Sequence, residues 1–140
     1  VAGQAWESEY APRLEAYHQA KTGALFVAAT TAGAVAAGAD PGPWGALGSR
    51  LGEAYQVADD LRDAVAQPDE VGKPVGRDAE LARPSAVTEL GLNGALERLN
   101  ALIKSAIDSI PECRGRASLR TLVRTQQKRL VPKALQESAA

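Results

Sequence analysis

Apolar residues recur every three to four positions along most of the chain, and an alternation with period two is sustained nowhere. The first spacing is typical of an α-helix with one buried face, whereas the second would indicate a strand. In the segment 93–107, for example, the apolar stripe consists of Leu96, Leu99, Ile103 and Ile107. The pattern therefore predicts an all-α fold.

Proline and glycine residues mark where the predicted helices begin and end. We expect helices over about residues 12–38, 44–65, 84–91, 93–106 and 118–130. The breakers in 38–43 end the first helix, and Gly91 closes a short one that begins near Pro84. Asn93 is suited to cap the next helix, and Pro111 separates it from the last one.

Length and composition indicate one small domain covering residues 1–140, with a formal net charge of −1 at pH 7. This balance argues against nucleic-acid binding, and we expect the basic stretch 124–133 to be a solvated helix end. Cys113 is the only cysteine, which excludes an internal disulfide and favours a reducing cytoplasm. Cys113 and the single His18 cannot supply the ligands of a usual zinc site.

Residues 22–39 form an uncharged run that raises the question of a membrane span. About 20 predominantly apolar residues are needed to cross a bilayer. This run is rich in Ala, Gly and Thr and poor in large aliphatic residues, which is weak for insertion. We therefore expect a buried helix of a bundle and no membrane span.

An acidic stripe is the most informative local pattern. Gln56, Asp59, Asp60 and Asp63 fall at positions i, i+3, i+4 and i+7, on one side of a helix. Like charges at this spacing destabilise an isolated helix, which suggests an external cation, and oxygen ligands favour Mg²⁺. The alternative is a solvated acidic face with Arg62 as a local partner. The aspartates by themselves leave both interpretations open.

A loop rich in glycine and proline, residues 71–78, follows this stripe and carries Lys73 and Arg77. Such cations are suited to hold an anion against a metal ion. Taken together, the stripe and the loop resemble the second aspartate-rich motif and adjoining loop of the trans-isoprenyl diphosphate synthases. Four motifs of that family occur in its order: Gly3-Gln4, Lys21-Thr22-Gly23, Gln56 with Asp59-Asp60 and Asp63, and Gly72-Lys73-Pro74.

Segments 20–26, 56–63 and 109–113 are similar to the geranylgeranyl diphosphate synthases of carotenoid and bacteriochlorophyll pathways in purple bacteria. The resemblance implies an isoprenoid-synthase-type helical bundle and a prenyltransferase that condenses isopentenyl diphosphate with an allylic diphosphate. The implied Mg²⁺ ligands are Asp59 as the principal one, Asp63, and Asp60 in support. The implied diphosphate-binding residues are Lys21 and Lys73. The implied residues beside the reacting carbons are Thr22 and Gln56.

The chain departs from that family in one respect. Members are about twice as long and carry a first aspartate-rich motif in their N-terminal half, whereas this sequence has a single aspartate cluster. We therefore expect the C-terminal half of a bundle, inactive alone, from an enzyme that is a cytoplasmic homodimer. The alternative is a non-catalytic helical subunit or fragment that binds diphosphate or a partner.

Overall fold

The computed structural model describes residues 19–66 and 85–137, and within these ranges it contains helices and no strand. The elements are a π-helix η1 (Gln19–Gly23), α3 (Ala24–Ala36), a 3₁₀ helix η2 (Gly42–Trp44), α4 (Gly45–Ala66), α5 (Ala86–Asp108), α6 (Arg116–Leu130) and α7 (Lys133–Glu137). The all-α prediction is confirmed for this part of the chain. The predicted loop with Lys73 and the motif at Gly3-Gln4 lie outside it.

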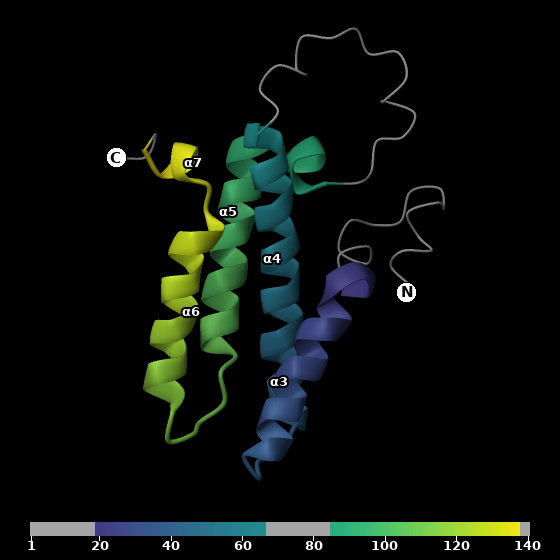
Figure 1. The fold of residues 1–140 in the computed structure, drawn as a ribbon, viewed down its shortest axis with the longest axis vertical. Helices are drawn as coiled ribbons and strands as arrows, with labels where there is room; N and C mark the ends of the chain where they lie inside the picture. Colours follow the sequence, from purple (N-terminus) through teal and green to yellow (C-terminus); the bar gives the residue numbers. More distant parts are fainter. Residues whose placement is uncertain (1–18, 67–84, 138–140) are drawn as a thin grey trace, which may run out of the picture.

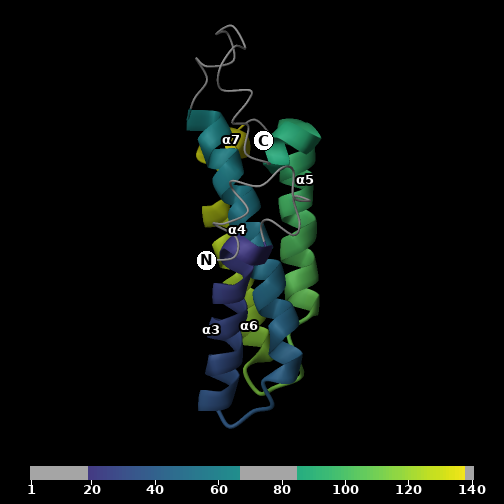
Figure 2. The same ribbon diagram turned by 90° about the vertical axis from the view of Figure 1, so that its right-hand side faces the viewer.

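Helix α4 is the centre of the arrangement (Figure 1). It packs against α3 on one side and against α5 on the other, and α6 packs on α5. The side view in Figure 2 shows α3 and α5 on opposite sides of α4. Among the described elements, α3 therefore makes its main contacts with α4 and with η1 and η2, which flank it in the chain.

The apolar core lies between α4 and α5. The largest fully buried side chains are those of Leu61, Leu99, Ile103, Ile110 and Val57. Each such side chain stabilises the fold by roughly 1.5–3 kcal/mol relative to an exposed position. Helix α6 adds one buried residue, Val123, to the same cluster. The pair α4–α5 is therefore the stable platform of the described structure.

The start and the bend of α5 follow from two residues. Ser85 caps the helix: its side chain accepts a hydrogen bond from the backbone of Thr88, and the Thr88 hydroxyl accepts one from the backbone of Ser85. Gly91 has φ 70° and ψ 172°, a conformation that costs a glycine little because it has no Cβ. The prediction that Gly91 closes a short helix before a longer one is confirmed.

Most other predicted boundaries hold within two residues. Helix α4 was expected over 44–65, and α6 begins at Arg116 rather than at 118. The predicted break after 38 is present, with Gly38 at φ 72°. The short α7 was not expected from the sequence, and residues before 19 are outside the described part.

The expectation of a buried helix over 22–39 is not met. Ala34 is the only buried residue of α3, and Leu25 and Val35 are 73% and 61% exposed. The helix contacts α4 along one side only, so its other, uncharged side faces outward. Among the described helices, none combines the length and the hydropathy needed to cross a bilayer.

Candidate functional site

Two glycines of α4 bring the α3 backbone unusually close. A Cβ added to Gly48 would lie 2.6 Å from the Val27 Cα, and one added to Gly52 would lie 2.8 Å from the Gly23 Cα. Gly48, Gly52 and Gln56 are spaced by four residues, so they share one side of α4. The beginning of α3 therefore meets α4 one turn before Gln56.

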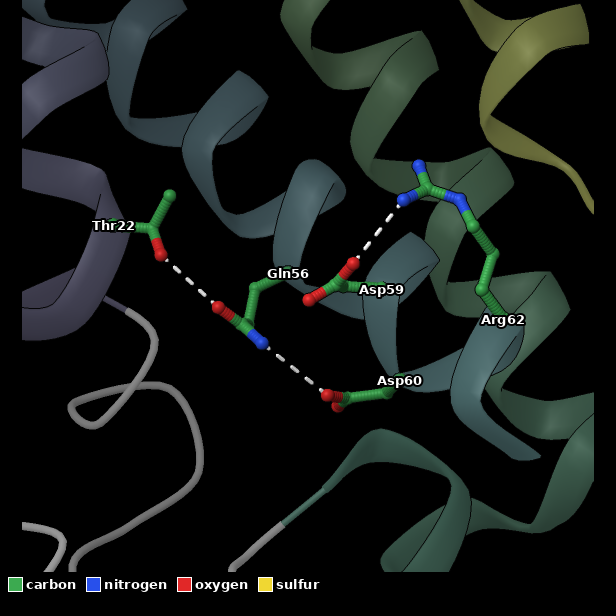
Figure 3. A network of polar contacts seen from close by, with 5 residues as sticks. All are labelled: Thr22, Gln56, Asp59, Asp60 and Arg62. Carbon is green, nitrogen blue, oxygen red and sulfur yellow. Dashed lines mark hydrogen bonds and ion pairs between the residues drawn. The ribbon is translucent and has the colours of Figure 1, made fainter. Parts of the chain in front are cut away.

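Three hydrogen bonds, here called the Thr22–Gln56–Asp60 network, connect η1, α4 and α5. Figure 3 shows the two that join Thr22, Gln56 and Asp60. The Thr22 hydroxyl donates to Gln56 Oε1 at 3.0 Å, and Gln56 Nε2 donates to Asp60 Oδ1 at 3.3 Å. The backbone N–H of Ala86 donates to Asp60 Oδ2 at 2.8 Å. Gln56 is only 7% exposed, so the middle of the network is shielded from water.

Asp60 therefore has a structural partner that its sequence position did not suggest. Ala86 is the first residue of α5, and the first N–H groups of a helix have no acceptor within the helix. The Asp60 carboxylate supplies one, at the helix end where the dipole favours negative charge. The contact joins residues that are 26 positions apart, which ties the start of α5 to α4.

Asp59 points to a different neighbour. Its carboxylate pairs with Arg62 at 3.1 Å (Figure 3). Arg62 also lies over the Tyr55 ring, 5.7 Å from the centroid. The side chains of Arg62 and Asp59 are 39% and 47% exposed, so this pair contributes about 0–1 kcal/mol. Arg62 is thus the local partner of Asp59 that the solvated-face alternative expects, and charge repulsion alone does not require an external cation. The pair is nevertheless weak enough for a stronger ligand to displace it.

Asp63 lies one turn after Asp59 and is exposed on α4. No ion pair of Asp63 occurs among the residues that the structure describes. In the same ranges, no group of three or more His, Cys, Asp or Glu side chains is placed to hold a metal ion. Lys21 lies in η1 beside Thr22, whereas Lys73 is outside the described residues. The structure thus joins Thr22, Gln56 and Asp60 but leaves the predicted metal and diphosphate contacts untested.

Comparison with known proteins supplies what geometry alone does not. The sequence model of the polyprenyl synthetase family matches residues 2–121. The chain belongs to this family. It is 55% identical over 131 residues to the geranylgeranyl diphosphate synthase of Cereibacter sphaeroides, an alignment that covers 94% of this chain and 46% of that protein.

Other relatives of this chain give the same picture. The geranylgeranyl diphosphate synthase of Rhodobacter capsulatus is 53% identical over 87% of this chain and 42% of its own length. The farnesyl diphosphate synthase of Geobacillus stearothermophilus is 35% identical over 76% of this chain and 39% of its own length. The chain therefore spans less than half the length of the curated relatives that it matches.

Two features of the site were not predicted from the sequence. The cap that Asp60 provides for α5 is a tertiary contact, and the only local hint was a helix start at Pro84-Ser85 that needed an acceptor. The stacking of Tyr55 with Phe26, 5.6 Å between centroids, and with Arg62 was not expected either. Tyr55 and Arg62 stand at positions i and i+7 of one helix, and this spacing is the feature of the sequence that could have predicted their contact.

Proposed function

We propose that this chain is part of a prenyltransferase that condenses isopentenyl diphosphate with an allylic diphosphate. The observation that carries the proposal is the Thr22–Gln56–Asp60 network. In α4, Gln56 follows the two glycines that contact α3 and η1 and precedes the aspartates. Relatives named geranylgeranyl diphosphate synthases, at 55% and 53% identity, support geranylgeranyl diphosphate as the product. The sequence resemblance supports a role in carotenoid or bacteriochlorophyll synthesis.

In this proposal the residues divide the work by charge. Asp59 and Asp63 hold Mg²⁺, Asp60 supports the site without binding the ion, and Lys21 and Lys73 hold the allylic diphosphate. Thr22 and Gln56 lie beside the reacting carbons, where their oxygen atoms stabilise the developing positive charge. Fixed dipoles of this kind accelerate a reaction because they are already oriented when the charge appears.

The donor set fits magnesium. Asp59 and Asp63 offer hard carboxylate oxygens one helical turn apart, and Mg²⁺ is usually held by one or two carboxylates together with waters and substrate phosphates. When bound, the ion would neutralise the negative charge that collects on the departing diphosphate. Within residues 19–66 and 85–137 the ligand set is incomplete, so we infer that the remaining ligands come from substrate and from the rest of the protein.

The proposed reaction has three changes of bonding. The carbon–oxygen bond of the allylic diphosphate breaks, and its electron pair leaves with the diphosphate. The double bond of isopentenyl diphosphate supplies the pair for a new carbon–carbon bond, and loss of a proton restores a double bond. Thr22 and Gln56 act in the first of these changes, because the allylic cation is most exposed there.

The remaining parts of the proposal concern the whole protein. We propose one synthetase domain of which residues 1–140 are a part, assembled as a homodimer in the cytoplasm. Nucleic acid is not among the proposed partners, since acidic and basic residues nearly balance.

A non-catalytic protein that binds diphosphate or a partner is the second candidate. It is favoured by one observation: Asp59 is paired with Arg62 on an exposed face, as in an ordinary solvated helix. This candidate predicts diphosphate binding without product formation.

The deciding experiment assays product formation by the whole protein from isopentenyl and farnesyl diphosphates with Mg²⁺. Asp59→Ala should lower kcat by at least about a hundredfold, because an electrostatic element of the transition state is lost. The matched control is Asp108→Ala, which also removes an exposed aspartate paired with an arginine, here Arg120 at 3.7 Å. It should leave kcat within about twofold. An inactive parent protein, or equal losses in both variants, would favour the second candidate.

The two lysines are tested by binding. Lys21→Ala and Lys73→Ala should each weaken the binding of an allylic diphosphate, since a hydrogen bond to a charged group contributes about 1.5–3 kcal/mol. Lys104→Ala, an exposed lysine of α5, is the control and should bind as the parent does. Unchanged affinity in both test variants would contradict their proposed role.

A further inference from the structure

We infer that Asp60 is a positioning residue that sets the direction of the hydrogen bonds in the Thr22–Gln56–Asp60 network, so that Thr22 presents oxygen lone pairs to the reacting carbons. The direction of the bonds is argued from the structure alone. The consequence for catalysis rests on the proposed prenyltransferase function.

The direction begins at the Asp60 carboxylate. An ionised carboxylate accepts hydrogen bonds and donates none. Its Oδ2 accepts from the Ala86 backbone at 2.8 Å, and its Oδ1 lies 3.3 Å from the Gln56 amide nitrogen. Only the –NH₂ end of Gln56 can face such an oxygen, so the Gln56 amide is held in one of its two orientations.

The orientation of Gln56 then determines what Thr22 does. With Nε2 turned to Asp60, the amide oxygen Oε1 faces Thr22 at 3.0 Å. An amide oxygen only accepts, so the single hydroxyl hydrogen of Thr22 must point at Gln56. The lone pairs of the Thr22 oxygen then face away from Gln56. There they would stabilise a developing cation, which the hydroxyl hydrogen would repel.

Burial keeps the orientation fixed. Gln56 is 7% exposed, so water has little access to compensate for a reversed amide. Reversal would place the –NH₂ group against Thr22 and the amide oxygen against the Asp60 carboxylate, two acceptors without a hydrogen between them. Leaving the buried Gln56 amide oxygen unpaired in this way costs about 1–3 kcal/mol.

The test variant is Asp60→Asn in the whole protein. The Ala86 N–H still needs an acceptor, so the Asn side-chain oxygen should take that place and its –NH₂ group should face Gln56. The Gln56 amide should then reverse, Thr22 should accept from Gln56, and the Thr22 hydrogen should turn toward the substrate. We expect kcat to fall by about tenfold or more, while the KM for the allylic diphosphate and the Mg²⁺ concentration at half-maximal rate change by less than about twofold.

The second variant exchanges the two groups: Gln56→Glu together with Asp60→Asn. The carboxylate at position 56 accepts from the Asn –NH₂ group on one side and from Thr22 on the other, so Thr22 donates again. Net charge is the same as in the parent. This exchange should recover most of the kcat that Asp60→Asn loses, and it should be faster than Gln56→Glu alone, in which two carboxylates face each other.

Kinetics distinguish positioning from metal binding. A Mg²⁺ requirement that rises tenfold in Asp60→Asn, with kcat restored at saturating Mg²⁺, would overturn the inference and make Asp60 a metal ligand. An exchange variant no faster than Asp60→Asn would also overturn it.

A readout without turnover keeps this inference separate from the proposed function. Selective labelling should show nuclear Overhauser contacts from the Gln56 side-chain amide hydrogens to Asp60 in the parent. In Asp60→Asn the same hydrogens should contact the Thr22 methyl group instead. This result is expected even if the protein makes no product, whereas an unchanged pattern in the variant would refute the assigned direction.

Discussion

The two sides of α4 are built by different means. Toward α5 it presents large aliphatic side chains, among them Leu61 and Val57, which are fully buried. Toward α3 and η1 it presents Gly48 and Gly52, where the backbones approach closely, and then Gln56, which bonds Thr22. The first side has the packing that stabilises a fold, whereas the second has little apolar area and fixed polar groups.

This difference separates stability from positioning. On the α5 side, loss of a methylene group removes buried apolar area, which lowers the free energy of unfolding. On the α3 side, a small shift of the backbone changes where Thr22 stands relative to Gln56, and the cost is expected in rate. A change on one side should therefore be distinguishable from a change on the other by comparing melting with kcat.

The largest loss of stability is expected from Leu61→Ala. Leu61 is fully buried between α4 and α5, so its truncation should lower the free energy of unfolding by about 2–5 kcal/mol. The control is Leu122→Ala, a leucine of α6 that is 54% exposed and should change stability by less than about 0.5 kcal/mol. Denaturant unfolding of the whole protein measures both. Equal losses would contradict the assignment of the α4–α5 interface as the main core.

Gly52→Ala should have a smaller effect on stability and a clear effect on rate. The new Cβ would meet the Gly23 backbone at 2.8 Å, which forces α3 and η1 away at a cost of about 1–3 kcal/mol. Because Gly23 follows Thr22, kcat should fall as well. Gly45→Ala is the matched control in the same helix, since a Cβ there meets nothing within 4 Å. If both variants kept the parental kcat, the close approach would have no functional role.

The sequence was sufficient for the helices because their signals are local. The boundaries of α4, the break at Gly91 and the stop at Gly38 follow from apolar periodicity and from glycine and proline. The exposure of α3 was not predictable, since its run of small residues is equally consistent with a buried helix. What covers one side of a helix is a tertiary property that its own residues do not specify.

The acidic stripe shows the same limit at the site. The spacing puts Gln56, Asp59, Asp60 and Asp63 on one stripe, yet successive residues of a helix point about 100° apart. That angle directs Asp59 to Arg62 and Asp60 to the first turn of α5. The spacing predicted that the four residues are neighbours, but it could not predict that they have different partners.

An intermediate effect on stability is expected from Arg98→Met on the α5 side. Arg98 forms an ion pair with Glu53, whose side chain is only 11% exposed, so removing the arginine leaves that carboxylate poorly solvated. The loss should be about 1–2 kcal/mol, reduced from the cost of a fully buried pair because Arg98 itself is 37% exposed. Its kcat should stay near the parental value. A loss of kcat without a change in the free energy of unfolding would contradict the assignment of the α5 side to stability alone.

The smallest effect on stability is expected from Arg62→Ala, which bears on the site most directly. The exposed pair with Asp59 contributes about 0–1 kcal/mol, so the free energy of unfolding should hardly change. If Asp59 binds Mg²⁺, the arginine competes with the ion for the same carboxylate. Its removal should then lower the Mg²⁺ concentration at half-maximal rate, and the energy of the pair converts to at most about fivefold.

Arg120→Ala is the control for Arg62→Ala, because it frees Asp108 from a similar surface pair far along α5. It should leave the Mg²⁺ dependence unchanged. A higher Mg²⁺ requirement in Arg62→Ala would mean that the arginine orients Asp59 for the ion rather than competing with it. No change in either variant would place the ion away from Asp59, and the polar side of α4 would then position Thr22 and Gln56 without holding the metal.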